Sequence, residues 1–339
     1  MKKKILVTGG LGYIGSHLCI SLLERGFVPI IIDNFTNSHK SVINNIKKIS
    51  KRKFYFYNID LLNKKKLDKV FDLHKIYAVI HCASLKSVSE SIKEPARYFS
   101  TNLNITLNLI ECMKKRNIFR LIFSSSASVY NNNISPPFNE NNKIGKTTNA
   151  YATSKYLIEK ILNDLSKFEK KWKIGIARYF NAISNHESGL IYENPKNVPS
   201  NLFPYLINVL KKKYSFLKIY GSDYNTKDGT CIRDYIHVMD LAYGHILILK
   251  KKFSGVKIYN FGSGKGFSVL EVLNEFKKQT NKSISYKFYN KREGDIPISI
   301  CSTKKVANEL GWRPRKDLKK SINDIILMLK KNHKKLFLN

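Results

Sequence analysis

The chain has 339 residues, 43% of them hydrophobic, which is enough to bury a large core and excludes a disordered protein. No stretch approaches the roughly 20 apolar residues of a membrane span, and the basic start meets Gly9 too early for a signal peptide, so we expect a cytoplasmic protein with no membrane partner. The formal net charge is +35, but the lysines are spread over the whole length, so we expect no nucleic-acid partner.

Cysteine and histidine usage argues against two further classes of site. The five cysteines are odd in number, far apart and without a C-x-x-C pair, which is unlike a disulfide framework or a zinc site. The eight histidines show no metal-ligand spacing. We therefore expect no metal.

Short β-branched runs alternate with helical patterns in the first half, which is typical of a parallel sheet. They predict strands at 4–8, 28–32, 54–59, 78–82, 120–124 and 174–179, and helices at 13–25 and 151–168. After Asn181 the chain becomes rich in Pro, Asn and Gly, which predicts a smaller second lobe. The predicted fold class is α/β. A doubly wound parallel sheet takes residues 1–181 and about 237–262, and a smaller α/β lobe takes 182–236 and 263–339.

Gly9, Gly12 and Gly15 follow the first predicted strand and open the first predicted helix. Glycine permits a tight turn and lets a pyrophosphate approach the backbone, while the helix N-terminus favours negative charge. The spacing G-x-x-G-x-x-G is one residue longer than the common dehydrogenase form. Asp33 closes the second strand, where a carboxylate accepts hydrogen bonds from ribose hydroxyls and disfavours a 2′-phosphate, although an ordinary turn residue is the alternative. These residues indicate a Rossmann fold that binds NAD in preference to NADP.

Tyr151 and Lys155 lie four residues apart on a predicted helix and therefore share one face. A phenol has a pKa near 10, and lowering it to about 7 needs roughly 4 kcal/mol. One cation about 5 Å away supplies on the order of 3 kcal/mol at an effective dielectric constant of 20. A second positive charge, such as an oxidised nicotinamide ring, would complete the shift. The spacing also arises by chance in a chain rich in both residues, but its place after the glycine loop favours a catalytic pair beside NAD.

Ser124, Ser125 and Ser126 end a predicted strand at the carboxyl edge of the sheet, where ligands bind in doubly wound folds. A serine hydroxyl at that edge can bridge a substrate oxygen and the phenol. Serines also end strands for structural reasons alone, and we expect this of one or two of the three.

Several motifs in order resemble the UDP-glucose 4-epimerases of the extended short-chain dehydrogenase/reductase family. They are Thr-Gly-Gly-Leu-Gly-Tyr-Ile-Gly-Ser-His at 8–17, Asp-Asn-Phe-Thr-Asn-Ser at 33–38, Ser-Ser-Ser-Ala-Ser-Val-Tyr at 124–130 and Tyr-x-x-x-Lys at 151–155. The similarity continues with Arg-Tyr-Phe-Asn at 178–181, Asn-Leu-x-Pro-Tyr at 201–205, Asp-Gly-Thr-Cys-Ile-Arg-Asp-Tyr-Ile-His-Val at 228–238 and Arg-Glu-Gly-Asp at 292–295. The resemblance covers nearly the whole chain.

The resemblance implies a reaction and a set of site residues. As phenolate, Tyr151 would take the proton of the sugar 4-hydroxyl while tightly bound NAD takes hydride from C4. Ser126 would form a hydrogen bond with the reacting oxygen, and Lys155 would hold the cofactor ribose. The implied cofactor contacts are Gly9, Gly12, Tyr13, Ile14, Gly15, Asp33, Asn34, Asn37, Ser38, Asp60, Leu61, Lys86, Tyr151, Lys155 and Phe180. The implied UDP-sugar contacts are Lys86, Ser126, Tyr151, Asn181, Asn201, Leu202, Tyr220, Arg233, Arg292, Asp295 and Ser299.

The chain also departs from the family pattern. Glycine is usual where this chain has Ser84, Asn131 and Ala152, and Pro-Val-Gly is usual where it has Ala-Ile-Ser at 182–184. Thr101 replaces a common NAD-contacting Asn. Ser299 replaces the bulky tyrosine of strict glucose/galactose enzymes, which leads us to expect that N-acetylhexosamine sugars are also accepted. The family resemblance further implies a two-fold homodimer through two helices of each subunit, around 104–113 and 151–168.

Three alternatives to this function make different demands on the residues around the predicted site. Nucleotide-sugar dehydratases and decarboxylases need acidic residues just after the catalytic hydroxyl, where this chain has Ala127 and Ser128. An epimerase acting on UDP-glucuronate remains open. A non-enzymatic, NAD-sensing binding module would typically have lost Tyr151 or Lys155, whereas both are present here together with Ser126.

Overall fold

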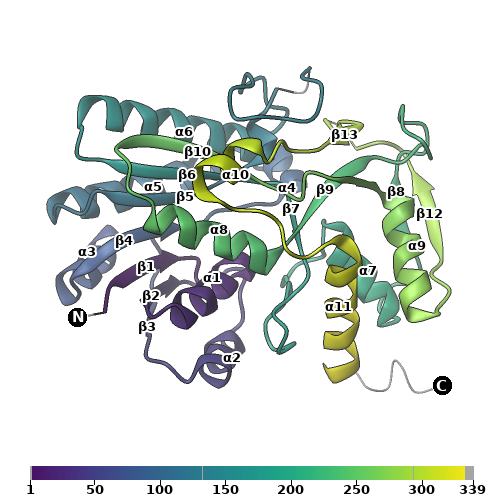
Figure 1. The fold of residues 1–339 in the computed structure, drawn as a ribbon, viewed down its shortest axis with the longest axis horizontal. Coiled ribbons are helices and arrows are strands. Elements are labelled where there is room, and N and C mark those ends of the chain that lie inside the picture. Colours follow the sequence, from purple (N-terminus) through teal and green to yellow (C-terminus); the bar gives the residue numbers. More distant parts are fainter. Residues whose placement is uncertain (1, 132, 293, 333–339) are drawn as a thin grey trace.

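A seven-stranded parallel sheet forms the centre of the protein (Figure 1). In the computed structural model, which describes residues 2–131, 133–292 and 294–332, its strand order is β10-β6-β5-β4-β1-β2-β3. The strands are β1 (Lys4–Thr8), β2 (Val28–Asp33), β3 (Tyr55–Asn58), β4 (Ile76–His81), β5 (Arg120–Ser126), β6 (Lys173–Tyr179) and β10 (Gly255–Phe261). The order reverses between β1 and β4, so the carboxyl ends of these two strands flank the crevice where such sheets bind ligands.

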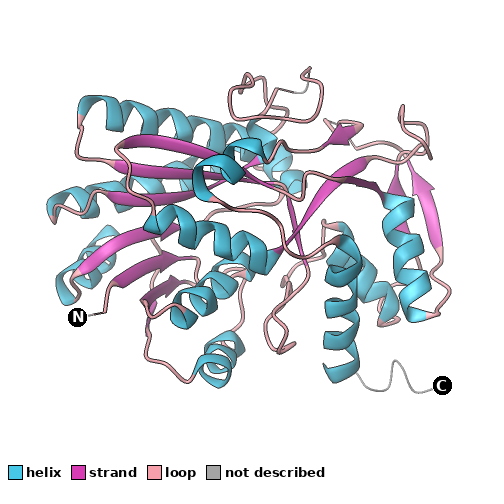
Figure 2. Ribbon diagram, viewed as in Figure 1, coloured by secondary structure: helices cyan, strands magenta, loops and turns pink. Residues whose placement is uncertain are grey.

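Helices cover both faces of this sheet (Figure 2). One face packs against α1 (Tyr13–Glu24), α2 (Ser41–Ser50), α8 (Val238–Lys250) and α10 (Lys304–Leu310), and the other against α3 (Lys64–Leu73), α5 (Pro95–Lys115) and α6 (Ala150–Phe168). Because side chains alternate along a strand, Ile5 and Val7 enter the first core and Leu6 enters the second. Burial on both faces explains why these strands read as continuous apolar runs.

The second lobe packs around a third hydrophobic core beside the sheet (Figure 1). It contains α7 (Leu202–Leu210), α9 (Val269–Thr280) and α11 (Leu318–Asn332), the strands β7 (Asn181–Ile183), β9 (Ile232–His237), β11 (Gly266–Ser268) and β13 (Ile298–Ser299), and the pair β8 (Leu217–Tyr220) and β12 (Tyr286–Tyr289). The remaining short elements, α4 (Val88–Lys93) and the 3-10 turn η1 (Ala127–Val129), follow β4 and β5.

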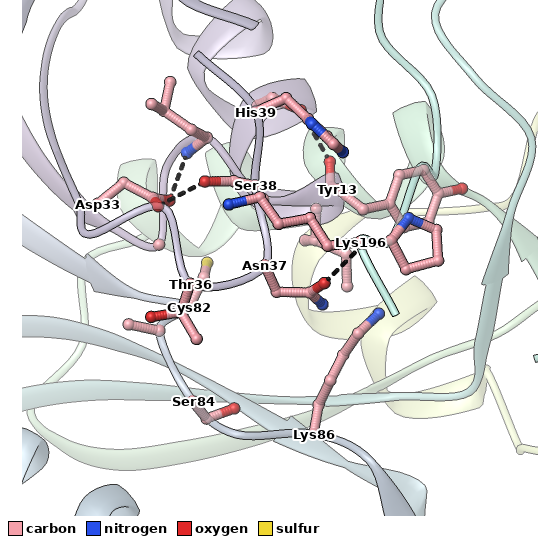
Figure 3. Close-up of a pocket in the computed structure, with 18 of the residues that line it drawn as sticks. Tyr13, Asp33, Thr36, Asn37, Ser38, His39, Cys82, Ser84, Lys86 and Lys196 are labelled. Carbon is pink, nitrogen blue, oxygen red and sulfur yellow. Dashed lines mark hydrogen bonds between the residues drawn. The ribbon is translucent and has the colours of Figure 1, made fainter. Parts of the chain in front are cut away.

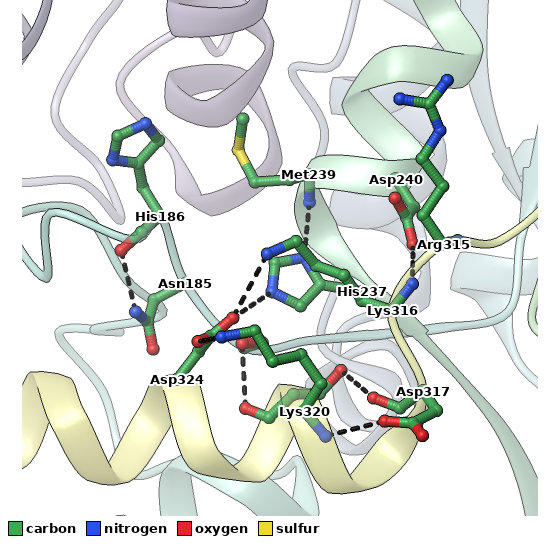
Figure 4. Close-up of polar contacts among 12 residues, drawn as sticks. Asn185, His186, His237, Met239, Asp240, Arg315, Lys316, Asp317, Lys320 and Asp324 are labelled. Atoms are coloured by element: carbon green, nitrogen blue, oxygen red, sulfur yellow. Dashed lines mark hydrogen bonds and ion pairs between the residues drawn. The ribbon is translucent and has the colours of Figure 1, made fainter.

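Helix α11 is tied to the junction of the two lobes by a buried polar network (Figure 4). Asp324 on α11 lies 3.3 Å from His237 Nε2 and accepts a 2.7 Å hydrogen bond from Lys320 Nζ. His237 Nδ1 accepts from the backbone amide of Met239, so Nε2 carries the proton in the neutral ring. Asp240 accepts from the backbone amides of Arg315 and Lys316. The segment before α11 is therefore bound to Asp240, and the middle of α11 is bound to His237.

The predicted fold class is confirmed, and most predicted strands lie within a few residues of the observed ones. Strand β5 extends to Ser126 rather than ending at 124, because its ladder with β6 continues through the pair Ser126 and Tyr179. The limits of the lobes stay a prediction. Trp312, from a segment assigned to the second lobe, packs edge-on against Phe261 of β10, with ring centroids 5.1 Å apart.

Candidate active site and cofactor cavity

The turn between β1 and α1 leaves no room for a Cβ at Gly9 or Gly15. A Cβ added to Gly15 would lie 2.1 Å from the carbonyl oxygen of Gly9, and Gly9 itself has φ +64°. Gly12 is the N-cap of α1, and no side chain caps the free amides of that helix end. The first turn of α1 carries no acidic residue. An open helix N-terminus beside a glycine turn suits a pyrophosphate, so the residues present fit NAD.

Asp33 is fixed as an acceptor at the end of β2. Its carboxylate accepts hydrogen bonds from Leu11 N at 3.0 Å, Phe35 N at 2.9 Å and Ser38 Oγ at 2.7 Å. These contacts hold the carboxylate at the rim of the glycine turn, where the ribose hydroxyls of a dinucleotide would lie. Beside it, Asn34 Nδ2 donates to Asp60 Oδ2 at 3.0 Å, so the loops after β2 and β3 are linked.

A cavity of about 1010 Å³ opens at this edge of the sheet (Figure 3). Twelve predicted cofactor residues line it: Gly9, Gly12, Tyr13, Ile14, Gly15, Asp33, Asn34, Asn37, Ser38, Asp60, Leu61 and Lys86. The departures Ser84 and Thr101 line it as well. Of the predicted substrate residues it includes only Lys86 and Asn201, while Ser126, Tyr151, Lys155 and Phe180 lie outside its lining.

One wall of the cavity comes from residues 190–201, a segment in which sequence reasoning singled out Asn201 alone. Glu193 Oε1 lies 3.2 Å from Lys86 Nζ and accepts a 3.0 Å hydrogen bond from Asn201 Nδ2. The backbone amide of Lys196 donates to Asn37 Oδ1 at 3.1 Å, and His39 Nε2 donates to the carbonyl of Asn194. The sequence gives no signal for these long-range contacts, since the segment reads as an ordinary loop.

The three serines of β5 serve three different partners. The Ser124 hydroxyl lies 3.1 Å from Cys82 Sγ and 2.7 Å from the Tyr179 hydroxyl. Ser125 donates to Glu159. Ser126 Oγ accepts from the amide of Ser128 at 3.2 Å and from its hydroxyl at 2.9 Å. With its acceptor positions used, the Ser126 hydroxyl is left to donate its own proton.

Helix α6 carries Tyr151 in its first turn, next to Ser126. The Asn149 side chain caps this helix by accepting from the amide of Ala152 at 2.9 Å, which fixes where the turn begins. Burial raises the pKa of the Tyr151 phenol above its ordinary value of 10, and a hydrogen bond with Ser126 opposes that rise. By itself the chain therefore holds the phenol protonated at neutral pH.

Lys155 is buried one turn along the same face. Its ammonium donates a 2.8 Å hydrogen bond to the carbonyl of Ser124 and lies 6.0 Å from the centroid of the Tyr151 ring. Burial lowers the pKa of Lys155 to about 8, while Cys82 and Glu159 act to raise it. The ammonium is therefore mostly charged at pH 7 and lies close enough to favour a phenolate.

The predicted UDP-sugar residues other than Lys86, Ser126 and Tyr151 lie in the second lobe, and several of them form two groups. Arg233 Nη2 lies 3.3 Å from Asp295 Oδ1, and Ser299 of β13 pairs in register with Arg233 of β9. The Arg292 guanidinium stacks over the Tyr220 ring at 4.0 Å and donates to the carbonyl of Ser200, next to Asn201. Leu202 begins α7, Asn181 begins β7, and Phe180 is buried against Phe138.

One departure from the family pattern has a clear conformational effect. Ser184 adopts φ +76°, a left-handed conformation that favours glycine. Its carbonyl accepts from the Tyr13 hydroxyl at 2.8 Å, and its own hydroxyl donates to the carbonyl of Ser321 at 2.9 Å. These two contacts join the cofactor turn to α11. In contrast, Ala152 fits a fully buried helical position without strain.

Helices α5 and α6, which contain the two segments predicted to form a dimer contact, are buried mainly on the faces that pack against the sheet. Leu109 and Ile110 of α5 and Ile158 and Leu162 of α6 are buried in the core of the sheet, whereas Leu107 is 39% exposed. No helix among the described residues is long and apolar enough to cross a membrane.

Comparisons with known proteins agree with the motifs. Residues 5–262 match the family model "NAD dependent epimerase/dehydratase family". The UDP-glucose 4-epimerase of Haemophilus influenzae is 44% identical over 332 residues, covering 97% of this chain and 98% of that protein. The crystal structure of the Bifidobacterium longum UDP-glucose 4-epimerase in complex with NAD⁺ and UDP has a TM-score of 0.95 at 39% identity, with 97% of this chain and 99% of that chain covered.

A further solved structure, the UDP-Glc/GlcNAc 4-epimerase of Campylobacter jejuni, is 31% identical with a TM-score of 0.82, and the alignment covers 97% of this chain and 99% of that one. The resemblance drawn from the sequence motifs is thus confirmed over nearly the full length. This chain belongs to the NAD dependent epimerase/dehydratase family.

Proposed function

We propose that this chain interconverts UDP-glucose and UDP-galactose by transient oxidation at C4 with tightly bound NAD. The observation that carries the proposal is that Ser126 hydrogen-bonds Tyr151 and Lys155 lies over the same ring, at the end of a strand whose Ser124 contacts Cys82 in the wall of the cavity. The 44% identity to an epimerase over 97% of this chain and 98% of that protein supports the same chemistry.

The chain's own residues account for the proton transfer. The Tyr151 oxygen is the acceptor for the proton of the sugar 4-hydroxyl, and the hydroxyl proton of Ser126 stabilises the charge that develops on the reacting oxygen. Lys155 keeps a positive charge near the phenol throughout the cycle. When bound, NAD supplies a reversible hydride acceptor and a second positive charge. Ala127 and Ser128 supply no acid for elimination, so the proton returns to the same oxygen.

The two arginine groups of the second lobe suit a UDP portion. Arg233 and Arg292 supply the planar, charged donors that a diphosphate prefers. Tyr220 offers an aromatic face, although Arg292 covers one side of it. We place the sugar between Arg233 and Tyr151, with Asn181, Asn201, Leu202 and Asp295 among its contacts.

The proposal is tested by incubating the purified chain with UDP-galactose, without added NAD, and measuring UDP-glucose. We expect conversion by the wild type and none by Tyr151→Phe, which keeps the ring and removes the proton acceptor. Absence of conversion by the wild type, also after NAD is added, would refute the activity. Conversion by Tyr151→Phe would refute the assigned proton acceptor.

Acceptance of UDP-N-acetylglucosamine is a second candidate, supported by Ser299. This small side chain is buried and lies beside Arg233 in the β13–β9 pair, at the sugar side of the diphosphate site that we propose. The Campylobacter jejuni neighbour is named for both sugars. We expect turnover of both UDP-glucose and UDP-N-acetylglucosamine, and Ser299→Tyr should remove only the second. No turnover of the N-acetyl sugar by the wild type would sink this idea.

We further propose a cytoplasmic homodimer that meets through α5 and α6, with Leu107 at the contact. The supporting observation is that this apolar side chain is 39% exposed on the outer face of α5, where its neighbours Asn104 and Glu111 are polar. Light scattering during gel filtration should give twice the mass of 39.2 kDa. Leu107→Lys should lower that mass, and a wild-type chain that runs as a monomer at all concentrations would refute the dimer.

A further inference from the structure

A buried ion pair lies directly beneath the strand end that carries Ser126. Glu159 of α6 and Arg178 of β6 are both essentially inaccessible to solvent. Arg178 Nε donates to Glu159 Oε1 at 3.0 Å, and Arg178 Nη2 donates to Oε2 at 2.6 Å. Ser125 Oγ donates to the same Oε1 at 2.5 Å. One carboxylate thus joins α6, β5 and β6.

A contribution to folding stability does not by itself explain why this buried ion pair is present. The cost of removing two charges from water can exceed their attraction, and apolar replacements of such pairs are often neutral or stabilising. Arg178 Nη1 is also buried without a hydrogen-bond partner among the described residues, although the guanidinium stacks 4.8 Å from the Tyr130 ring. The hydrogen-bonding capacity of Arg178 is therefore not fully used, and an unpaired donor is most costly in a buried site of low dielectric constant.

The position of Glu159 explains what the pair can do. Glu159 follows Lys155 by four residues and Tyr151 by eight, so all three share one face of α6. Its partner Ser125 stands between Ser124, whose carbonyl accepts the Lys155 ammonium at 2.8 Å, and Ser126. The carboxylate is the side-chain link between the catalytic face of α6 and the middle serine of β5.

Accordingly, we propose that Glu159, held by Arg178, is a positioning residue for the reaction. It fixes α6 against the end of β5 so that Tyr151 and Lys155 face Ser126. This inference rests on the proposed epimerase function. Because a misplacement of about 1 Å within a catalytic group can cost on the order of 100-fold in rate, loss of the link should lower kcat far more than substrate affinity.

The test replaces both partners at once with Glu159→Met/Arg178→Met, which leaves no unpaired buried charge. We expect a folded protein with an unchanged thermal midpoint, a kcat lower by about 100-fold, and a KM for UDP-galactose and a Kd for UDP by calorimetry within about threefold of wild type. The matched control is Lys64→Met/Glu111→Met, which removes an exposed ion pair between α3 and α5. It should change none of these quantities.

A second variant, Glu159→Gln/Arg178→Met, keeps an acceptor for Ser125 and leaves no unpaired buried charge, so its kcat should lie between those of the wild type and the double variant. Hydrogen exchange gives a readout that needs no activity: amides at 150–156 should lose protection in the double variant while those of β1 keep theirs. A double variant with a kcat within threefold of wild type would overturn the inference. So would one that fails to fold, or that loses UDP affinity in step with kcat.

Failure of the proposed function is distinguishable from failure of this inference. If the wild type binds UDP but does not convert UDP-galactose, the epimerase assignment is refuted, and the exchange experiment then decides the role of Glu159. Unchanged exchange at 150–156 in the double variant would refute the positioning role whatever the reaction.

Discussion

Replacement of Lys155 by methionine isolates the contribution of one positive charge to the active site. Methionine has a similar length and fits a buried position, so packing should change little. The Lys155 ammonium lies 6.0 Å from the centroid of the Tyr151 ring. At an effective dielectric constant of about 20, this separation corresponds to about 2.8 kcal/mol in favour of the phenolate, or about two pKa units.

Lys155→Met should therefore lower kcat by about 100-fold at pH 7, and the rate should recover as pH rises, because more phenol ionises without help. The assay is UDP-galactose turnover from pH 6 to 10, with bound NAD measured after denaturation so that loss of cofactor is separated from loss of charge. Lys160→Met is the control, since Lys160 lies 5.9 Å from the ring of Tyr156 on the exposed side of the same helix. A variant with wild-type kcat at pH 7, or with an unshifted pH profile at full NAD content, would refute the electrostatic reasoning.

Three other perturbations give separate checks. Gly15→Ala would place Cβ 2.1 Å from the oxygen of Gly9, so it should cost about 2 kcal/mol in urea unfolding and abolish NAD retention; a variant isolated with full NAD would contradict the fit of the turn. Ser184→Gly should be more stable than Ser184→Ala by about 1 kcal/mol, because only glycine relieves φ +76°, and equal stabilities would show that no strain is present. Burial lowers the pKa of His81 to about 3 and of His245 to about 4, below the 6.5 of the unfolded chain. Both contribute stability that is complete above pH 6.5 and is lost as pH falls, by about 2 kcal/mol each at pH 5, and a urea midpoint unchanged from pH 7.5 to pH 5 would exclude this.

The sequence pattern was sufficient to predict those features that depend only on interactions between residues close together in the chain. The glycine turn, the strand ending at Asp33 and the helix from Tyr151 depend on backbone sterics and on residues a few positions apart, and each was predicted close to its observed place. The shared face of Tyr151 and Lys155 follows from helical geometry alone. The expected lowering of the phenol pKa is not seen in the chain alone, because burial raises the pKa of Tyr151 above its ordinary value and burial depends on the whole fold.

Contacts between distant segments could not be read from the sequence. Nothing in residues 190–201 indicates that Glu193 meets Lys86, 107 residues earlier in the chain, because that contact depends on how distant segments pack together. The ion pair of Arg178 could not be read from the sequence either, because its partner Glu159 lies on α6 whereas Arg178 lies on β6.

By itself the sequence determined the fold class, the NAD fingerprint and the Tyr151–Lys155 face, since these depend on periodicity and on the steric needs of glycine. Only the tertiary structure decided how the three serines divide their work: Ser124 with Tyr179, Ser125 with the buried ion pair and Ser126 left to donate. Alternation along β5 sends neighbouring side chains to opposite faces, and other elements of the fold supply the partners there: β6 supplies Tyr179 for Ser124, and α6 supplies Glu159 for Ser125.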